Sequence, residues 1–235
     1  MKTPPVNLRS FFDLCILCHR RFHPEPGSII NLCPDCLSDL PWLRSCCSRC
    51  ALPLQSPNQN TLLCAHCISH PPSFDRIQSP FHYRFPIDHL ITQTKYQKQT
   101  CYISTLAELL WHHCDIPDSA DALIPVPMHP YSLIRRGFNQ ADLLARQLSR
   151  LSGIPLASHL IRKTRTTHAQ MGLNRQQRLR NQKGAFNCKR CPGLHLILID
   201  DVMTTGATLE TLSHSLKKAG ARRVEAITCA RTDQF

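Results

Sequence analysis

The chain has 235 residues, enough for one ordinary domain of roughly 100–200 residues and a small accessory module. Its formal net charge is +12, of which residues 1–120 carry +1 and residues 121–235 carry +11, so we expect the C-terminal half to face a polyanion. No apolar run approaches the roughly 18–20 residues of a membrane span, and neither end has a signal-peptide pattern, so we expect a soluble, cytoplasmic protein without membrane insertion.

The N-terminal region is rich in cysteine. Nine of the 14 cysteines lie within the first 67 residues, and eight of them form four Cys-x-x-Cys pairs. Two cysteines three residues apart direct both sulfur atoms at one ion, and two such pairs complete the tetrahedral shell of structural Zn²⁺. We therefore predict a double zinc-ribbon module over residues 1–70, with one or two sites that supply much of its folding free energy. The predicted ligands are Cys15, Cys18, Cys33, Cys36, Cys47, Cys50, Cys64 and Cys67.

The spacing leaves the ligand assignment open. Cys46 could replace Cys47, the pairs could combine in crossed order, or a histidine could enter a shell, namely His19, His66 or His70. Cysteines without metal, reduced or linked as disulfides, are the alternative, although a cytoplasm keeps thiols reduced.

Residues 71–120 are expected to form a linker and a packing helix. Several prolines and scattered aromatic residues up to Arg84 favour an extended connection, and apolar residues recur at helical intervals over residues 86–113. Farther along, Cys188 and Cys191 have no second pair nearby, so we expect a turn between strands there rather than a third metal site.

The strongest motif joins an expected strand to an expected helix. Residues 194–199 are an apolar run typical of a buried parallel strand, and residues 209–218 place leucines at helical intervals. A loop of Thr, Gly and Ala at a helix N-terminus can surround a phosphate with backbone N–H groups, and Gly206 permits close approach. The acid pair before the loop would repel a bare phosphate, so it implies a ligand with hydroxyl groups or a divalent cation. An ordinary turn in which the acids cap the helix is the alternative.

All thirteen positions from Leu196 to Thr208 fit the type I phosphoribosyltransferase signature, which this segment resembles. The resemblance implies an α/β fold, a parallel sheet flanked by helices, over residues 121–235, and phosphoribosyl pyrophosphate with Mg²⁺ as ligand. It also implies that the acids contact ribose hydroxyls and that the loop binds the 5′-phosphate. The implied site residues are Asp200, Asp201, Thr204, Thr205, Gly206, Ala207 and Thr208. Candidates for an earlier pyrophosphate-binding turn are Val126, Pro127, Met128 and His129.

Two further blocks narrow the family. Residues 135–140 read Arg-Arg-Gly-Phe-Asn-Gln, with Asn139 placed to cap a helix that runs through Arg150, and residues 162–190 hold nine Lys/Arg and no Asp/Glu. With the cysteine pairs and the phosphate loop, these blocks resemble the ComF family, which includes the GntX proteins, over nearly the whole chain. In that family Ala51 is often Gly. The resemblance implies a role in competence, the uptake of single-stranded DNA during natural transformation. We also expect the basic stretch and the zinc module to offer docking surfaces, including for DNA-uptake helicase machinery.

Three functional readings remain open at this point. In the first, basic side chains bind DNA phosphates while the pocket senses phosphoribosyl pyrophosphate or a nucleotide. The second is an active phosphoribosyltransferase of nucleotide metabolism, with an unidentified nitrogen acceptor and no catalytic residue that we can name. The basic stretch would then close over a small anion, and cations would stabilise developing charge. A zinc-ribbon regulator with a vestigial pocket is a third reading. The basic candidates are Arg135, Arg136, Arg162, Lys163, Arg165, Arg175, Arg178, Arg180 and Lys183, and the candidates for base stacking are Phe74, Phe81, Tyr83 and Phe186.

Overall fold

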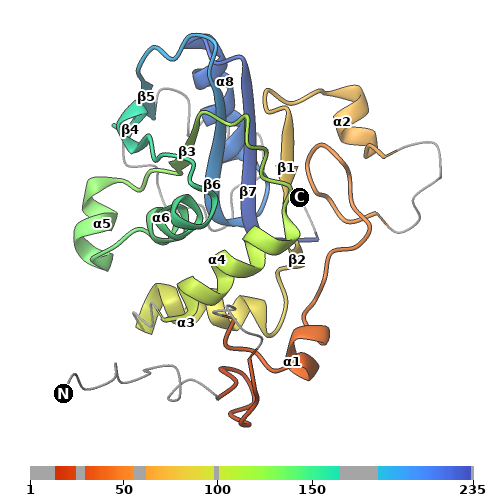
Figure 1. Ribbon diagram of the computed structural model, residues 1–235. Helices are drawn as coiled ribbons and strands as arrows, with labels where there is room; N and C mark the ends of the chain where they lie inside the picture. The colour runs from red at the N-terminus through yellow and green to blue at the C-terminus, as the bar shows by residue number, and fades with distance from the viewer. Residues whose placement is uncertain (1–13, 25–29, 55–61, 98–100, 165–184, 234–235) are drawn as a thin grey trace.

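A parallel β-sheet forms the centre of the computed structural model, which describes residues 14–24, 30–54, 62–97, 101–164 and 185–233 (Figure 1). The order of the strands is β1-β7-β6-β3, and β2 also pairs with β7, always in parallel. A separate antiparallel pair joins β4 to β5. The strands are β1 Arg76–Gln78, β2 Phe81–His82, β3 Ala122–Pro125, β4 Ile161–Lys163, β5 Phe186–Cys188, β6 His195–Met203 and β7 Arg223–Arg231.

Helices cover both faces of the sheet. Successive side chains of a strand point to opposite faces, so Leu196 and Leu198 of β6 pack in one core while Ile197 and Ile199 pack in the other. Helix α8 lies on the first face, and α3, α4 and α6 lie on the second. This arrangement confirms the predicted α/β fold class. The helices are α1 Pro34–Ser38, α2 Ala65–Ser69, α3 Ile87–Gln97, α4 Cys101–His113, α5 Pro130–Arg136, α6 Gln140–Ser152 and α8 Ala207–Lys218, with a 3₁₀ turn, η2, at Ser158–Leu160.

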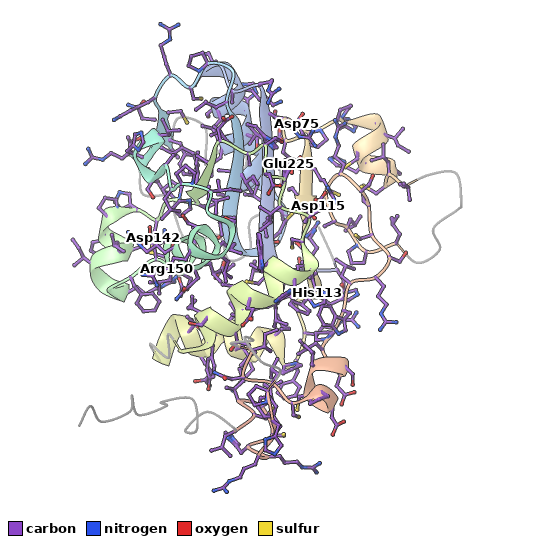
Figure 2. The ribbon with its side chains drawn as sticks, viewed as in Figure 1. Asp75, His113, Asp115, Asp142, Arg150 and Glu225 are labelled. Atoms are coloured by element: carbon purple, nitrogen blue, oxygen red, sulfur yellow. The ribbon has the colours of Figure 1, made fainter. Side chains whose placement is uncertain are left out.

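The predicted linker differs from the extended connection that its composition suggested. It contributes β1 and β2 to the sheet, and the helical segment expected over residues 86–113 forms two helices, α3 and α4. Asp75, just before β1, accepts a hydrogen bond from Val224 N at 2.7 Å and pairs with Lys217 Nζ at 2.6 Å (Figure 2). These partners lie far away in the sequence, so no local pattern indicates them. The division of the chain at residues 70 and 120 stays a prediction.

The cysteine-rich region packs on both sides of the sheet. The buried cysteines Cys47, Cys50, Cys64 and Cys67 belong to the core on the α8 side. Cys15 and Cys33 belong to the core formed with α3, α4 and α6. The region is therefore joined to the sheet through two separate apolar contacts. Among the described residues, no helix has the length and apolar character needed to cross a membrane.

Candidate functional site

The predicted phosphate loop lies between β6 and α8. The strand extends farther than expected, through the acid pair to Met203, and α8 begins at Ala207. Gly206 is the N-cap with φ of 75°, and a Cβ added there would lie 2.5 Å from Met203 Cε. A residue without a side chain thus suits this position in both conformation and space.

Six of the seven predicted phosphate-site residues line one small cavity. Asp200 of β6 lines it together with the loop from Thr204 to Thr208. Asp201 is the exception: it is half-buried on the strand beside the cavity, and its Oδ1 accepts a hydrogen bond from Val202 N at 2.8 Å. Neighbouring residues of a strand face opposite ways, which explains why only one acid of the pair reaches the cavity.

Two of the predicted basic residues are neighbours on β4 but differ in their exposure to solvent. Arg162 is exposed, whereas Lys163 is half-buried with its Nζ 5.6 Å from the centre of the Phe186 ring. Burial lowers the pKa of Lys163, and the negative charge of Asp200 partly opposes that effect. Lys163 therefore interacts with the charge of Asp200, while Arg162 faces solvent.

Of the remaining basic candidates, Arg136 is the one whose side chain the structure describes. Arg136 is half-buried, and its Nη1 donates a hydrogen bond to Gln140 Oε1 at 3.0 Å. The side chain of Arg135 and all of Arg165, Arg175, Arg178, Arg180 and Lys183 lie outside the described residues.

A larger cavity of about 420 Å³ lies at the carboxyl end of β3. Of the pyrophosphate-loop candidates, Pro127 and Met128 line it, Val126 is buried, and His129 caps α5 by accepting a hydrogen bond from Tyr131 N at 3.2 Å. The other residues that line this cavity are Pro125, Leu133, Gly137, Phe138, Asn139, Asp142, Leu143 and Ser158. The walls are mostly apolar, so the cavity suits a ring better than a phosphate group.

Asn139 holds this region together, and the prediction that it caps α6 is confirmed. Its Oδ1 accepts from Ala141 N at 3.2 Å, and its Nδ2 donates to Val126 O at 3.0 Å. One side chain thus fixes the start of α6 against the turn that follows β3.

The cysteines gather into two groups of four whose sulfur atoms all lie within 4.8 Å of one another: Cys15, Cys18, Cys33 and Cys36, and Cys47, Cys50, Cys64 and Cys67. The pairs combine in sequence order, and among the described residues neither Cys46 nor a histidine joins either group. A tetrahedral ion with Zn–S bonds of about 2.3 Å needs sulfur atoms about 3.8 Å apart. The distances Cys18–Cys33 and Cys50–Cys64 are both 3.7 Å, so the two groups fit structural zinc.

The backbone of both groups favours metal-binding turns. His19 and Ala51, each directly after the second cysteine of a pair, have φ of 57° and 53°. This left-handed conformation explains why Gly is often found at the position of Ala51 in the family that the sequence resembles. The hydrogen bond from the Cys50 side chain lowers the pKa of Cys47, with help from the backbone N–H of Cys64, and the same contact raises the pKa of Cys50, so Cys47 is the thiolate of this pair.

The second cysteine group lies against the phosphate loop. Cys50 and Cys67 line a cavity together with Met203, Thr205 and Gly206. No local sequence pattern indicates this contact, because it joins residues more than a hundred positions apart.

The residues proposed for base stacking are mostly in the core. Phe74, Phe81 and Phe186 are buried, and Tyr83 is half-buried. The prediction of a stacking platform is therefore wrong for the three phenylalanines, because a packed ring offers no free face. The turn expected around Cys188 and Cys191 is confirmed, since it connects β5 to β6.

Comparisons with known proteins agree with this geometry. The family of the phosphoribosyl transferase domain matches residues 109–234. Competence protein F of Haemophilus influenzae is 33% identical over 95% of this chain and 100% of that protein. DNA utilization protein YhgH of Salmonella typhimurium is 32% identical over 93% and 97%. Competence protein ComFC of Bacillus subtilis is 34% identical over 49% and 47%. The chain therefore belongs to the ComF family, whose C-terminal part is a phosphoribosyl transferase domain.

Proposed function

We propose that the protein acts in DNA uptake by handling single-stranded DNA while its loop Thr204–Thr208 binds phosphoribosyl pyrophosphate or a related nucleotide. The names of two relatives, a competence protein and a DNA utilization protein, support the first part. The observation that carries the second part is the cavity that Asp200 shares with the five loop residues. In this proposal backbone N–H groups and Thr hydroxyls bind the 5′-phosphate, and Asp200 accepts from the ribose hydroxyls.

Mg²⁺ fits this proposal as the companion of the pyrophosphate. It binds hard oxygen ligands and usually keeps substrate phosphates in its shell, and Asp200, which lines the cavity, offers a carboxylate. When bound, the ion would neutralise the phosphate charges that the carboxylate otherwise repels. The two cysteine groups would hold structural Zn²⁺, since all four ligand positions of each are sulfur.

The test is calorimetric titration with phosphoribosyl pyrophosphate and Mg²⁺, with and without single-stranded DNA. We expect the wild type to bind at micromolar concentration and Asp200→Asn/Asp201→Asn to lose binding, while Asp118→Asn, at an exposed loop position, binds as the wild type does. A change in ligand affinity upon DNA addition would support the sensing role. No binding by the wild type would contradict the proposal.

The DNA part has its own matched pair of variants on β4. Arg162→Gln should weaken single-stranded DNA binding and reduce its salt dependence by about one counterion, because Arg162 is exposed. Lys163→Gln should instead weaken phosphoribosyl pyrophosphate binding, because Lys163 lies close enough to Asp200 to interact with its charge. If both variants weakened the binding of both ligands equally, the assignment of Arg162 to DNA and of Lys163 to phosphoribosyl pyrophosphate would be wrong.

An active phosphoribosyltransferase is the second candidate, and the cavity of about 420 Å³ beside the pyrophosphate-loop candidates favours it. Its size and mostly apolar walls suit a heterocyclic nitrogen acceptor. The test is pyrophosphate release from phosphoribosyl pyrophosphate in the presence of purine and pyrimidine bases. Turnover by the wild type, together with a raised KM for the base in Phe138→Ala, would support this function. Binding without release for every base would leave the sensing role.

A further inference from the structure

Arg231, the last residue of β7, has no exposed surface and yet carries a guanidinium group. In the sheet it pairs with Met203, the last residue of β6. Its Nη1 donates to Met203 O at 3.2 Å, to Thr232 O at 3.1 Å and, in a closer contact, to Thr204 O. A buried cation therefore lies directly behind the start of the phosphate loop.

These contacts determine which way two loop peptides face. A trans peptide is planar, and its C=O and N–H point in opposite directions. Because the carbonyl groups of Met203 and Thr204 point at Arg231, the N–H groups of the next residues, Thr204 and Thr205, point away from it. Thr204 and Thr205 both line the small cavity with Asp200.

We propose that Arg231 is a positioning residue for phosphate binding, which turns the N–H groups of Thr204 and Thr205 toward a 5′-phosphate and adds a fixed positive charge behind them. This inference rests on the proposed function of the loop and goes beyond it, because Arg231 would act on the ligand without touching it. An arginine suits the role because a guanidinium stays charged when it is buried, whereas the ammonium of a buried lysine loses its proton more readily.

The test compares two probes, each of which carries one part of phosphoribosyl pyrophosphate. Ribose 5-phosphate carries the group that the loop would bind, and pyrophosphate with Mg²⁺ carries the group that would lie elsewhere. Arg231→Gln keeps a donor and loses the charge, Arg231→Met loses both, and Arg231→Lys keeps the charge. We expect Gln and Met to weaken ribose 5-phosphate binding roughly tenfold or more and to leave pyrophosphate within about twofold, with Lys between them and the wild type.

Arg223→Gln is the matched control for loss of one positive charge from β7. Arg223 lies at the opposite end of the strand, where its Nε donates to Glu225 Oε1 at 2.6 Å, and we expect no change for either probe. Thermal unfolding of each variant separates general stability from ligand binding.

Three results would overturn the inference. The first is an equal loss of affinity for both probes in Arg231→Gln or Arg231→Met, and the second is an unchanged affinity for ribose 5-phosphate in folded Arg231→Gln. The third applies if Arg231→Lys is the one variant that folds: it is wild-type affinity for ribose 5-phosphate together with unchanged amide hydrogen exchange at residues 203–208. Failure of the proposed function looks different, because the wild type itself would then bind neither phosphoribosyl pyrophosphate nor ribose 5-phosphate.

Discussion

The carboxylate of Glu210 accepts two hydrogen bonds from Ser73, one from its backbone N–H at 2.9 Å and one from its hydroxyl at 2.7 Å. Glu210 lies in the first turn of α8, directly after the phosphate loop, and Ser73 follows the second cysteine group. The contact therefore fastens the cysteine-rich region to the helix that begins at the candidate ligand site.

We expect Glu210→Gln to lower the free energy of unfolding by about 1–3 kcal/mol, because it weakens two hydrogen bonds to a charged acceptor. A negative charge near the helix N-terminus is lost as well. Urea unfolding measures the effect. The control is Arg146→Gln, which breaks the exposed pair with Asp142 on α6 and should cost only about 0.2–0.5 kcal/mol. Equal losses would show that the contact does not fasten the region to α8.

Substitutions at two glycines distinguish an effect on stability from an effect on ligand binding. Gly206 and Gly153 both have φ of 75°, but a Cβ at Gly206 would meet Met203 Cε at 2.5 Å, whereas a Cβ at Gly153 meets no atom within 4 Å. Gly206→Ala and Gly153→Ala should each lose about 1–2 kcal/mol of stability, the cost of a left-handed residue with a side chain. Calorimetry should show weaker binding of phosphoribosyl pyrophosphate for Gly206→Ala alone. Unchanged affinity in that variant would remove the loop from the ligand site.

Loss of metal should affect the ligand site through the second cysteine group only. Cys67 shares a cavity with Thr205 and Gly206 of the loop, whereas Cys36 belongs to the first group and packs against the other core. We expect Cys67→Ser to weaken phosphoribosyl pyrophosphate binding roughly fivefold or more, a usual size for coupling between sites, and Cys36→Ser to leave it near the wild type.

Metal analysis provides the control for this pair. Each variant should lose about half of the bound zinc, because each removes one of four ligands from one of two groups. Equal ligand affinity in the two variants, with zinc lost from both, would contradict coupling between the second group and the loop.

His195 should make stability depend on pH. It is the first residue of β6, its side chain is buried, and its Nε2 lies 3.8 Å from Glu225 Oε1. Burial lowers the pKa of His195, and Glu225 only partly offsets this, while Arg223 lowers it further. Below pH about 6.5 the unfolded chain takes up a proton that the folded protein resists. This contribution to stability is therefore complete above that pH and is lost as the pH falls.

The measurement is urea unfolding at pH 7 and pH 5. His195→Gln should reduce the loss of stability between these values, whereas His159→Gln, at an exposed position, should leave it unchanged. Parallel pH curves for wild type and His195→Gln would contradict the expectation.

Local spacing accounts for the features that the sequence alone determined. The Cys-x-x-Cys pairs, the strand that leads into the acid pair and the cap at Asn139 each depend on residues a few positions apart, so their chemistry can be read without a fold. The α/β class was implied by the resemblance of residues 196–208 to the phosphoribosyltransferase signature. Six of the seven residues that the sequence predicted for a phosphate site line one cavity, and Asp201 does not.

Tertiary structure decided how these parts meet. The pairing of β1 and β2 with β7, the contact of Glu210 with Ser73, and the position of Arg231 behind Thr204 all join residues that are distant in the sequence or depend on the strand order. It also placed Cys47 rather than Cys46 in the second group and buried three expected stacking rings. Such choices depend on packing between elements, because the free energy of burial is set by what lies opposite a side chain and not by its neighbours along the chain.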